Sequence, residues 1–325
     1  MAERDPIERL NEALERGALD DSVPLAADIR ELLAVARRLR GMPREEFRQQ
    51  LRFQLEEKAM MRTAATETIQ LREGFRSLTP YIIVQGAAQF IDFMREVFGA
   101  EERFRVPGPD GIIMHAEVKI GDSMIELADG NDQYPPRPAA IHLYVPDARR
   151  VYDRAQAAGA ISLHPVEEMH YGELSGSVQD PFGNQWYIAT YHGANYTPEG
   201  LHTVNPCLLP VGADGLIAYL KEAFGAEEME VFRRPEDGPI VHAKIRLGDT
   251  ILEMGEAHGP FGPMPTGLHF YVPDVDAVYE RALKAGGASI SAPKDQPYGE
   301  RGAGVTDPAG NSWFLATPLA RPDSF

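Results

Sequence analysis

The 325-residue sequence predicts an α+β protein in which an all-α segment, residues 1–77, precedes two tandem modules of paired βαβββ units. Three observations support this prediction. Apolar residues recur at helical spacing through the first 77 residues, whereas later they alternate along short runs that end at tight turns. The chain beyond this segment repeats itself at an offset of 126 or 127 residues. Within each copy, a short strand, a helix and three strands occur twice.

The N-terminal segment is expected to form three short helices. Asp5 and Pro6 are typical of an N-cap and a first helical turn, Ser22 opens a second helix, and Gly41 with Pro43 ends it before a third. We interpret this helical domain, residues 1–77, as an element for packing or self-association. The alternative is a docking site for a partner protein. No residue in it suggests catalysis.

The repeat defines two modules, residues 79–192 and 203–318, which "HGANYTPEG" connects. "MHAEVKIGDSMIEL" (114–127) returns as "VHAKIRLGDTILEM" (241–254), and "DPFGNQWYIAT" (180–190) returns as "DPAGNSWFLAT" (307–317). Asp-Pro-x-Gly-Asn predicts a turn, because proline presets φ and glycine and asparagine tolerate positive φ. Trp186 in the following strand is expected to pack against a helix, which leaves Tyr187 on the opposite face.

The helices of module one have clear boundaries in the sequence. The first is expected to end at Gly99, and the second to begin after Asp147 and end at Gly159. The first helix places its large apolar residues on one side: Phe90, Phe93, Met94 and Val97.

Gly121-Asp122 predicts a two-residue hairpin turn, which pairs Ile120 with Ser123. Gly248-Asp249 predicts the same turn in module two. Because side chains alternate along a strand, the first hairpin has an apolar face for the helices: Ala116, Val118, Ile120, Ile125 and Leu127. Its polar face is expected to line a concave surface and carries His115, Glu117, Lys119, Met124 and Glu126.

Histidine, glutamate and tyrosine recur on such faces in both modules. The candidate ligand-binding residues are His115, Glu126, His142, Tyr144, Tyr187, His242, Glu253, His269 and Tyr271. Histidine and tyrosine beside a carboxylate can bind a metal, transfer protons or hydrogen-bond a polar ligand. A merely solvated polar face is the alternative interpretation.

Charge and composition limit the partners. The net charge of −17 is concentrated after residue 77, where the chain carries −16. An acidic body repels nucleic acid and anionic lipid, so we expect neither nucleic-acid nor membrane partners. No apolar run reaches the length of a membrane helix. The single cysteine, Cys207, is consistent with a reducing cytoplasm.

Motifs of both modules resemble the vicinal oxygen chelate superfamily, which includes glyoxalase I, bleomycin-resistance proteins, fosfomycin-modifying enzymes and extradiol dioxygenases. "PYIIV", "FGAEE", "MHAEVKIGDSMIEL", "HLYVPD", "YGE" and "DPFGNQW" carry the resemblance in module one. The resemblance is tighter to the PhnB-like, glyoxalase-like branch and excludes residues 1–77. It implies the vicinal oxygen chelate fold, with an open-sided cup around a ligand or metal. It also implies that a cup can combine half of one module with half of the other.

The resemblance also implies where metal ligands would lie, on strands one, four, five and eight. These positions are Thr79, Glu126, Ala140 and Tyr187 in module one, and Asn205, Glu253, Gly267 and Phe314 in module two. Only Glu126 and Glu253 are metal-ligand residues of the kind that the superfamily places there, so we expect no metal and no other cofactor. A relocated divalent-metal site, formed by His115, Glu126 and His142, is the alternative.

The expected function is therefore binding or sequestration of a small organic molecule, of the bleomycin-resistance type. One alternative is a lyase, isomerase or transferase of the glyoxalase superfamily with a relocated metal. Another is a ligand sensor with the helical domain as output. Whether the protein is an enzyme stays open.

The two modules are expected to differ. Pro210 predicts a first strand in module two that is shortened or at a sheet edge, and Lys244 and Arg246 make that cup more basic. The functional cup is therefore predicted to lie in module one, around His115, Glu126, His142 and Tyr144.

Overall fold

The computed structural model describes residues 71–236 and 238–319, and the helices predicted within residues 1–70 lie outside this part of the chain. Residues 71–77 differ from the predicted helix, because they form a turn at residues 73–74 and otherwise irregular chain that leads into the first strand. Gly74 has a φ of +84°, in the left-handed region, which a right-handed helix does not contain. The prediction of helix is therefore wrong for residues 71–77.

Each module contains the two predicted βαβββ units. In module one these are β1 (Leu78–Val84), α4 (Ala87–Phe98), β2 (Glu101–Pro107), β3 (Ile113–Ile120) and β4 (Ser123–Asp129), then β5 (Ala140–Tyr144), α5 (Ala148–Ala157), β6 (Ile161–Met169), β7 (Glu173–Gln179) and β8 (Gln185–Tyr191). A 3-10 helix, η2 (Pro109–Gly111), lies between β2 and β3. In module two they are β9 (Val204–Leu208), α6 (Ala213–Phe224), β10 (Glu227–Arg233), β11 (Ile240–Leu247) and β12 (Thr250–Met254), then β13 (Gly267–Tyr271), α7 (Val275–Lys284), β14 (Ala288–Asp295), β15 (Glu300–Thr306) and β16 (Ser312–Pro318).

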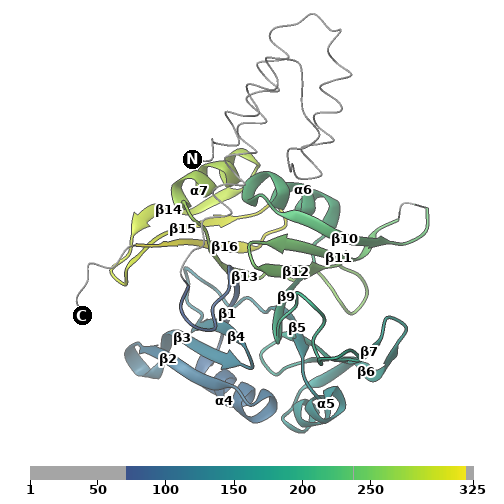
Figure 1. The fold of residues 1–325 in the computed structure, drawn as a ribbon. Coiled ribbons are helices and arrows are strands. Elements are labelled where there is room, and N and C mark those ends of the chain that lie inside the picture. The colour runs from purple at the N-terminus through teal and green to yellow at the C-terminus, as the bar shows by residue number, and fades with distance from the viewer. Residues whose placement is uncertain (1–70, 237, 320–325) are drawn as a thin grey trace, which may run out of the picture. The chain divides into compact units, whose positions relative to one another are not determined.

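The strands of the described residues form two eight-stranded sheets, and each sheet combines one unit from each module (Figure 1). Sheet A has the order β14-β15-β16-β13-β1-β4-β3-β2, and sheet B has the order β10-β11-β12-β9-β5-β8-β7-β6. The junctions are antiparallel pairs in the middle of each sheet, β1 with β13 and β5 with β9. The halves of the two modules are therefore exchanged between the sheets, as the resemblance implied.

Both predicted hairpins form in the predicted register. Ile120 pairs with Ser123 and Glu117 with Glu126, while Leu247 pairs with Thr250 across the second turn. The apolar face is buried in the hydrophobic core: Ala116, Val118, Ile120, Ile125 and Leu127 are at most 3% exposed. The opposite face of each sheet, turned away from the helices, is called its polar face below.

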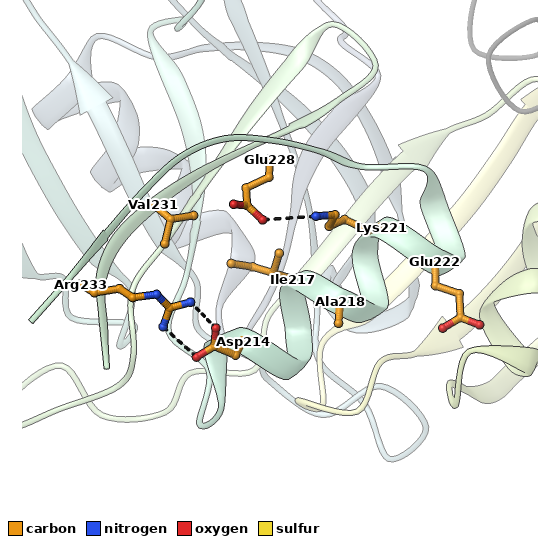
Figure 2. A pocket seen from close by; sticks show the side chains of 8 residues that line it. All are labelled: Asp214, Ile217, Ala218, Lys221, Glu222, Glu228, Val231 and Arg233. Carbon is orange, nitrogen blue, oxygen red and sulfur yellow. Dashed lines mark hydrogen bonds and ion pairs between the residues drawn. The ribbon is translucent and has the colours of Figure 1, made fainter. Parts of the chain in front are cut away.

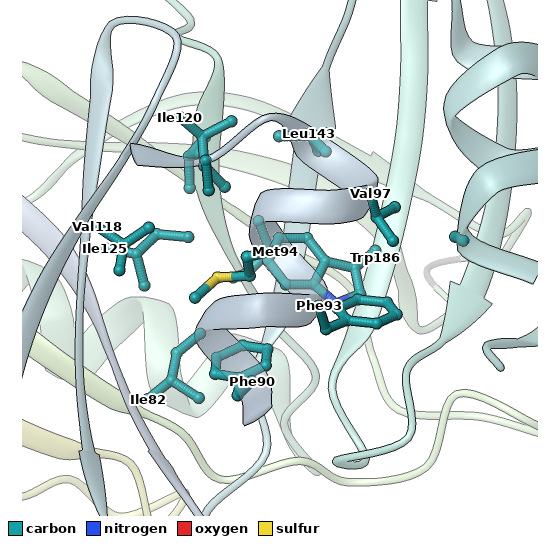
Figure 3. Close-up of a cluster of buried hydrophobic side chains, with 14 of the residues drawn as sticks. Ile82, Phe90, Phe93, Met94, Val97, Val118, Ile120, Ile125, Leu143 and Trp186 are labelled. Carbon is teal, nitrogen blue, oxygen red and sulfur yellow. The ribbon is translucent and has the colours of Figure 1, made fainter. Parts of the chain in front are cut away.

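The hydrophobic core of module one lies between its helices and strands of both sheets (Figure 3). Helix α4 buries the predicted residues Phe90, Phe93, Met94 and Val97 and ends at Gly99, which has a φ of 70°. The side chain of Asp147 caps α5 by accepting a hydrogen bond from Arg150 N. The described helices include none that is long and apolar enough to cross a membrane.

The repeated Asp-Pro-x-Gly-Asn motif anchors the buried tryptophan. Trp186 is fully buried, its ring centroid 4.4 Å from that of Phe98, and its indole N–H donates to Asp180 at 2.9 Å. Asp180 also accepts hydrogen bonds from the side chain of Asn184 and from two backbone N–H groups of the turn. Asp307, Asn311 and Trp313 repeat these contacts in module two. The motif is therefore structural, and the prediction for Trp186 is confirmed.

Strand β9 is shortened, as Pro210 predicted, but it does not lie at a sheet edge. It spans five residues, whereas β1 spans seven. It is central, however, because it lies between β12 and β5. A proline just beyond the strand removes no hydrogen bond inside the sheet, so the central position is compatible with it.

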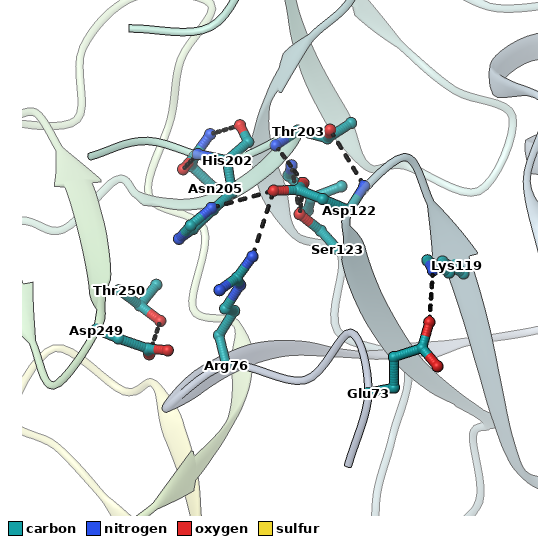
Figure 4. Close-up of polar contacts among 11 residues, drawn as sticks. Glu73, Arg76, Lys119, Asp122, Ser123, His202, Thr203, Asn205, Asp249 and Thr250 are labelled. Carbon is teal, nitrogen blue, oxygen red and sulfur yellow. Dashed lines mark hydrogen bonds and ion pairs between the residues drawn. The ribbon is translucent and has the colours of Figure 1, made fainter. Parts of the chain in front are cut away.

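The hairpin tips connect the two sheets (Figure 4). Asp122, at the tip between β3 and β4, accepts a hydrogen bond from Thr203 N at 2.9 Å and lies 3.2 Å from His202 Nδ1. Asp249 repeats this contact by accepting from Ser77 N at 2.7 Å. Each contact joins a hairpin of one sheet to the start of a strand in the other.

Replacing Gly121 with alanine is expected to lower the free energy of unfolding by about 2–3 kcal/mol. Gly121 has a φ of +57°, and an added Cβ would lie 2.4 Å from Thr203 Oγ1. Gly111→Ala is the matched control, since its φ is +80° but nothing lies within 4 Å of the added Cβ. Urea unfolding of both variants measures the difference, and equal losses would contradict the close approach at Gly121.

Candidate functional site

A buried histidine–glutamate pair lies at the centre of each polar face. His269 Nδ1 on β13 is 2.6 Å from Glu126 Oε2 on β4, across β1. His142 Nδ1 on β5 is 2.6 Å from Glu253 Oε2 on β12, across β9. Both glutamates are only 2% exposed. Because the sheets exchange halves, each pair takes its histidine from one module and its glutamate from the other.

A second carboxylate faces the other imidazole nitrogen. On sheet B, His142 Nε2 lies 3.8 Å from Glu173 Oε2, and Tyr144 donates its hydroxyl hydrogen bond to Glu173 Oε1 at 2.8 Å. The rings of His142 and Tyr144 stack with centroids 4.3 Å apart. Sheet A repeats this arrangement around His269. The hydroxyl of Tyr271 donates to Glu300 Oε1 at 3.1 Å, and His269 Nε2 lies 4.0 Å from Glu300 Oε2.

Sequence analysis missed Glu173 and Glu300 as site residues. Each is the last residue of the repeated "YGE", which the resemblance included without a role. The signal was available, since both are carboxylates at equivalent positions of the repeat. Their approach to histidine depends on the pairing of β7 with β8 and of β15 with β16, which composition does not specify.

A second histidine approaches the same glutamate on each sheet. His115 Nε2 lies 3.8 Å from Glu126 Oε1, and His242 Nε2 lies 3.3 Å from Glu253 Oε1. His115 and Glu126, which were predicted to share the polar face of the hairpin, therefore lie close together on it. Each central carboxylate thus has two imidazoles around it.

The charge of the central pairs follows from their surroundings. Burial alone would lower the pKa of His142, but the charge and hydrogen bond of Glu253 raise it above its ordinary value. The pKa of His269 is raised in the same way by Glu126, again against the effect of burial. Burial alone would raise the pKa of Glu253, yet His142 and His242 hold it well below its ordinary value. The pair of His142 and Glu253 therefore favours the ionised form of both partners.

The polar faces differ where the repeat differs. On sheet A, Arg72 binds Glu117 at 2.7 Å, and Tyr81 OH lies 3.4 Å from His115 Nδ1. On sheet B, Lys244 takes the place of Glu117 and binds Glu230 at 3.2 Å, and Cys207 takes the place of Tyr81. Arg246 is exposed.

Aromatic side chains extend both faces. Tyr187 packs beside Cys207 and lies 5.7 Å from the ring of Phe261, and Phe314 lies 5.1 Å from the ring of Tyr81. Neither Tyr187 nor Phe314 belongs to the core clusters that contain the helices.

The predicted centre of the functional cup is not assembled as one group. His115 and Glu126 lie on sheet A, whereas His142 and Tyr144 lie on sheet B. The relocated metal site of His115, Glu126 and His142 is therefore wrong, because the position beside Glu126 is occupied by His269. The exchange of halves between modules is the physical reason.

The strand positions that would carry the superfamily's metal ligands do not fit a metal. On sheet A they are Thr79, Glu126, Gly267 and Phe314, and on sheet B they are Asn205, Glu253, Ala140 and Tyr187. Each set contains one carboxylate and no histidine or cysteine, whereas transition metals in proteins require several such ligands.

Another group on sheet A has ligand atoms close enough for a metal. Donor atoms of His115, Glu117 and Glu126 lie within 4.8 Å of one another. Both carboxylates already bind cationic groups, however: Arg72 on Glu117 and His269 on Glu126. A metal ion would have to displace these interactions.

Purified protein is accordingly expected to contain no stoichiometric transition metal. The cations that neutralise Glu117 and Glu126 belong to the chain itself. Elemental analysis for zinc, nickel, manganese and iron checks this. One equivalent of any of them per chain, lost in a Glu126→Gln variant, would contradict the prediction.

The pocket in Figure 2 lies away from both polar faces, between α6 and β10. It has a volume of about 450 Å³. Four of its five charged side chains pair with one another, Arg233 with Asp214 and Lys221 with Glu228. These are exposed ion pairs of a kind common on protein surfaces, and they indicate no ligand site.

Comparison with known proteins agrees with this architecture. The model of the Glyoxalase/Bleomycin resistance protein/Dioxygenase superfamily matches residues 76–188 and 204–315. An uncharacterised protein of Mycobacterium bovis is 36% identical over 123 residues, which cover 34% of this chain and 81% of that protein. An uncharacterised protein of Mycobacterium tuberculosis is equally similar, over 72% of its length.

Solved structures share the fold at low sequence identity. A variant of glyoxalase I from Zea mays superposes with a TM-score of 0.60 at 15% identity, covering 80% of this chain and 96% of that one. Glyoxalase I from the same plant gives a TM-score of 0.57 at 16% identity, covering 74% and 92%. The chain belongs to the Glyoxalase/Bleomycin resistance protein/Dioxygenase superfamily and contains two tandem modules of it.

Proposed function

We propose that the protein binds a small organic molecule on the polar face of each sheet. The observation that carries this proposal is the histidine–glutamate pair, buried and repeated at equivalent positions of both sheets with the same distance of 2.6 Å. A polar ligand group would contact the imidazole or the second carboxylate, and tyrosine and phenylalanine side chains would form the walls.

Stability alone does not account for these pairs. A buried ion pair is often no more stabilising than apolar side chains of the same volume, because both charges lose their hydration. The pairs also lie on the face opposite the helices, outside the two main hydrophobic clusters. Convergent polar groups among aromatic walls are typical of sites for small molecules.

Two buried polar atoms support a ligand site on sheet B in particular. His142 Nε2 and Glu173 Oε2 have no hydrogen-bond partner, although both atoms are buried. A buried polar atom without a partner costs about 1–3 kcal/mol, so a ligand that supplies the missing hydrogen bond would be favoured.

Metal-dependent lyase, isomerase or transferase activity is the second candidate function. It is favoured by the cluster of His115, Glu117 and Glu126, whose donor atoms could surround an ion if Arg72 moved away. The elemental analysis described above separates this candidate from ligand binding without metal.

Native mass spectrometry of the purified protein tests the proposal. We expect a co-purifying molecule, and we expect His142→Ala and His269→Ala each to lower its occupancy. His164→Ala is the control, because this half-exposed histidine contacts the Pro165 carbonyl at 2.9 Å and the exposed Glu167 at 3.3 Å rather than a buried glutamate. If nothing co-purifies, a fragment library screened by ligand-observed NMR replaces the natural molecule. Fragments that bind none of the variants differently from the wild type would overturn the proposal.

A further inference from the structure

A short segment that precedes β1, residues 71–76, lies against the polar face of sheet A. Phe75 is 7% exposed and packs with Met124, Tyr271 and Ala316. Glu73 lies 3.5 Å from Lys119, and Arg76 lies 3.3 Å from Asp122 (Figure 4). We call this segment the strap.

The strap places a guanidinium over a buried carboxylate. Arg72 binds both oxygens of Glu117, with Nη2–Oε1 at 2.7 Å and Nη1–Oε2 at 3.0 Å. Its Cζ lies 4.3 Å from the centre of the Phe75 ring, a cation–π distance. The Glu117 side chain is 6% exposed, whereas that of Arg72 is 51% exposed. The carboxylate is thus enclosed, and the cation that neutralises it lies at the surface.

The second module shows that the fold does not require this arrangement. At the repeat offset, Leu201 corresponds to Phe75 and packs against Tyr144 and Ile251 in the same manner. Pro198 corresponds to Arg72, and Lys244 corresponds to Glu117. The apolar contact of the strap is therefore repeated, but the guanidinium and its carboxylate occur on sheet A alone.

We propose that Glu117 and the ring of Phe75 form a binding site for an organic cation, a guanidinium or an ammonium group, which Arg72 covers until a ligand displaces it. The proposal rests on ligand binding at the polar faces and names the ligand class for sheet A. Without Arg72, the buried Glu117 would keep His115 at 3.4 Å and would have a second carboxylate, Glu126, within 4.8 Å, so it would gain from any cation that replaces Arg72.

The displaced Arg72 can return to water, because its side chain is already half-exposed. The incoming cation takes its place on Glu117, so the buried carboxylate is not left unpaired. Glu126 is bound by the buried His269 and Glu300 by Tyr271, whereas the partner of Glu117 is the half-exposed Arg72, which an incoming cation can replace. Lys119 points to Glu73 and does not compete for it.

Chemical rescue of an Arg72→Ala variant tests the proposal. The probe is methylguanidinium chloride, titrated into the full-length chain by calorimetry at constant ionic strength. We expect Arg72→Ala to bind one equivalent per chain at least about tenfold more tightly than the wild type, since the probe no longer competes with an intramolecular guanidinium. Adding Glu117→Gln should abolish the gain.

Arg76→Ala is the matched control. Arg76 belongs to the same strap but pairs with Asp122, so this variant should bind the probe as weakly as the wild type. Circular dichroism verifies that each variant is folded, and Arg72→Lys, which retains a competing cation, should show a smaller gain. Equal affinities of the wild type and Arg72→Ala, or a gain that survives Glu117→Gln, would overturn the proposal. Either result would leave the proposal of ligand binding at His142, on sheet B, unaffected.

Discussion

Replacing Asp180 with alanine is expected to lower the free energy of unfolding by about 3–5 kcal/mol. Asp180 is 4% exposed and accepts hydrogen bonds from the Trp186 indole, the Asn184 side chain and two backbone N–H groups. Alanine would leave these donors without a partner in a site that water does not reach. Urea unfolding followed by tryptophan fluorescence measures the loss.

Asp307→Ala should give a loss of similar size, because Asp307 makes the same four contacts in module two. Asp153→Ala is the control, since this exposed aspartate should change the unfolding free energy by no more than about 0.5 kcal/mol. A loss at Asp180 as small as that at Asp153 would show that the turn relaxes to satisfy the donors in another way.

Replacing Glu253 alone with leucine is also expected to lower the free energy of unfolding by about 3–5 kcal/mol, because it leaves the buried His142 without its partner. The double variant Glu253→Leu/His142→Leu should recover most of this loss, since neither buried charge then remains. Chemical unfolding of the two single variants and the double variant gives the coupling between the residues. A double variant as unstable as Glu253→Leu would contradict a simple ion pair.

The same pair predicts how stability depends on pH. The pKa of His142 is raised on folding, so its contribution is complete below the ordinary value of 6.5 and is lost as pH rises through the folded pKa. The pKa of Glu253 is lowered, so its contribution is complete above 4.5 and is lost as pH falls through the folded pKa. The difference in stability between the wild type and the double variant should therefore be largest between pH 4.5 and 6.5, and a difference that is constant with pH would contradict the assigned charges.

Local structure was largely predictable from the sequence. The Gly121-Asp122 turn, the alternation from His115 to Leu127 and the caps at Gly99 and Asp147 depend on φ/ψ preferences and on the period of the apolar residues, which are local properties. The strap was the exception. Leu71 and Phe75 match a helical pattern when considered alone, but Gly74 and the contacts with Met124 and Tyr271 give the segment a different conformation.

The sequence by itself determined the tandem βαβββ modules, the apolar face of each hairpin and the residue types on the polar faces. It did not determine which residues meet there. The repeat predicts the same core for each module whether its two units pair with each other or with those of the other module, so periodicity cannot distinguish these arrangements. Only the tertiary structure decides between them. Strand β1 pairs with β13 and β5 pairs with β9, which places His269 beside Glu126 and His142 beside Glu253. Pairing of strands that lie far apart in the sequence depends on long-range packing, which no local pattern records.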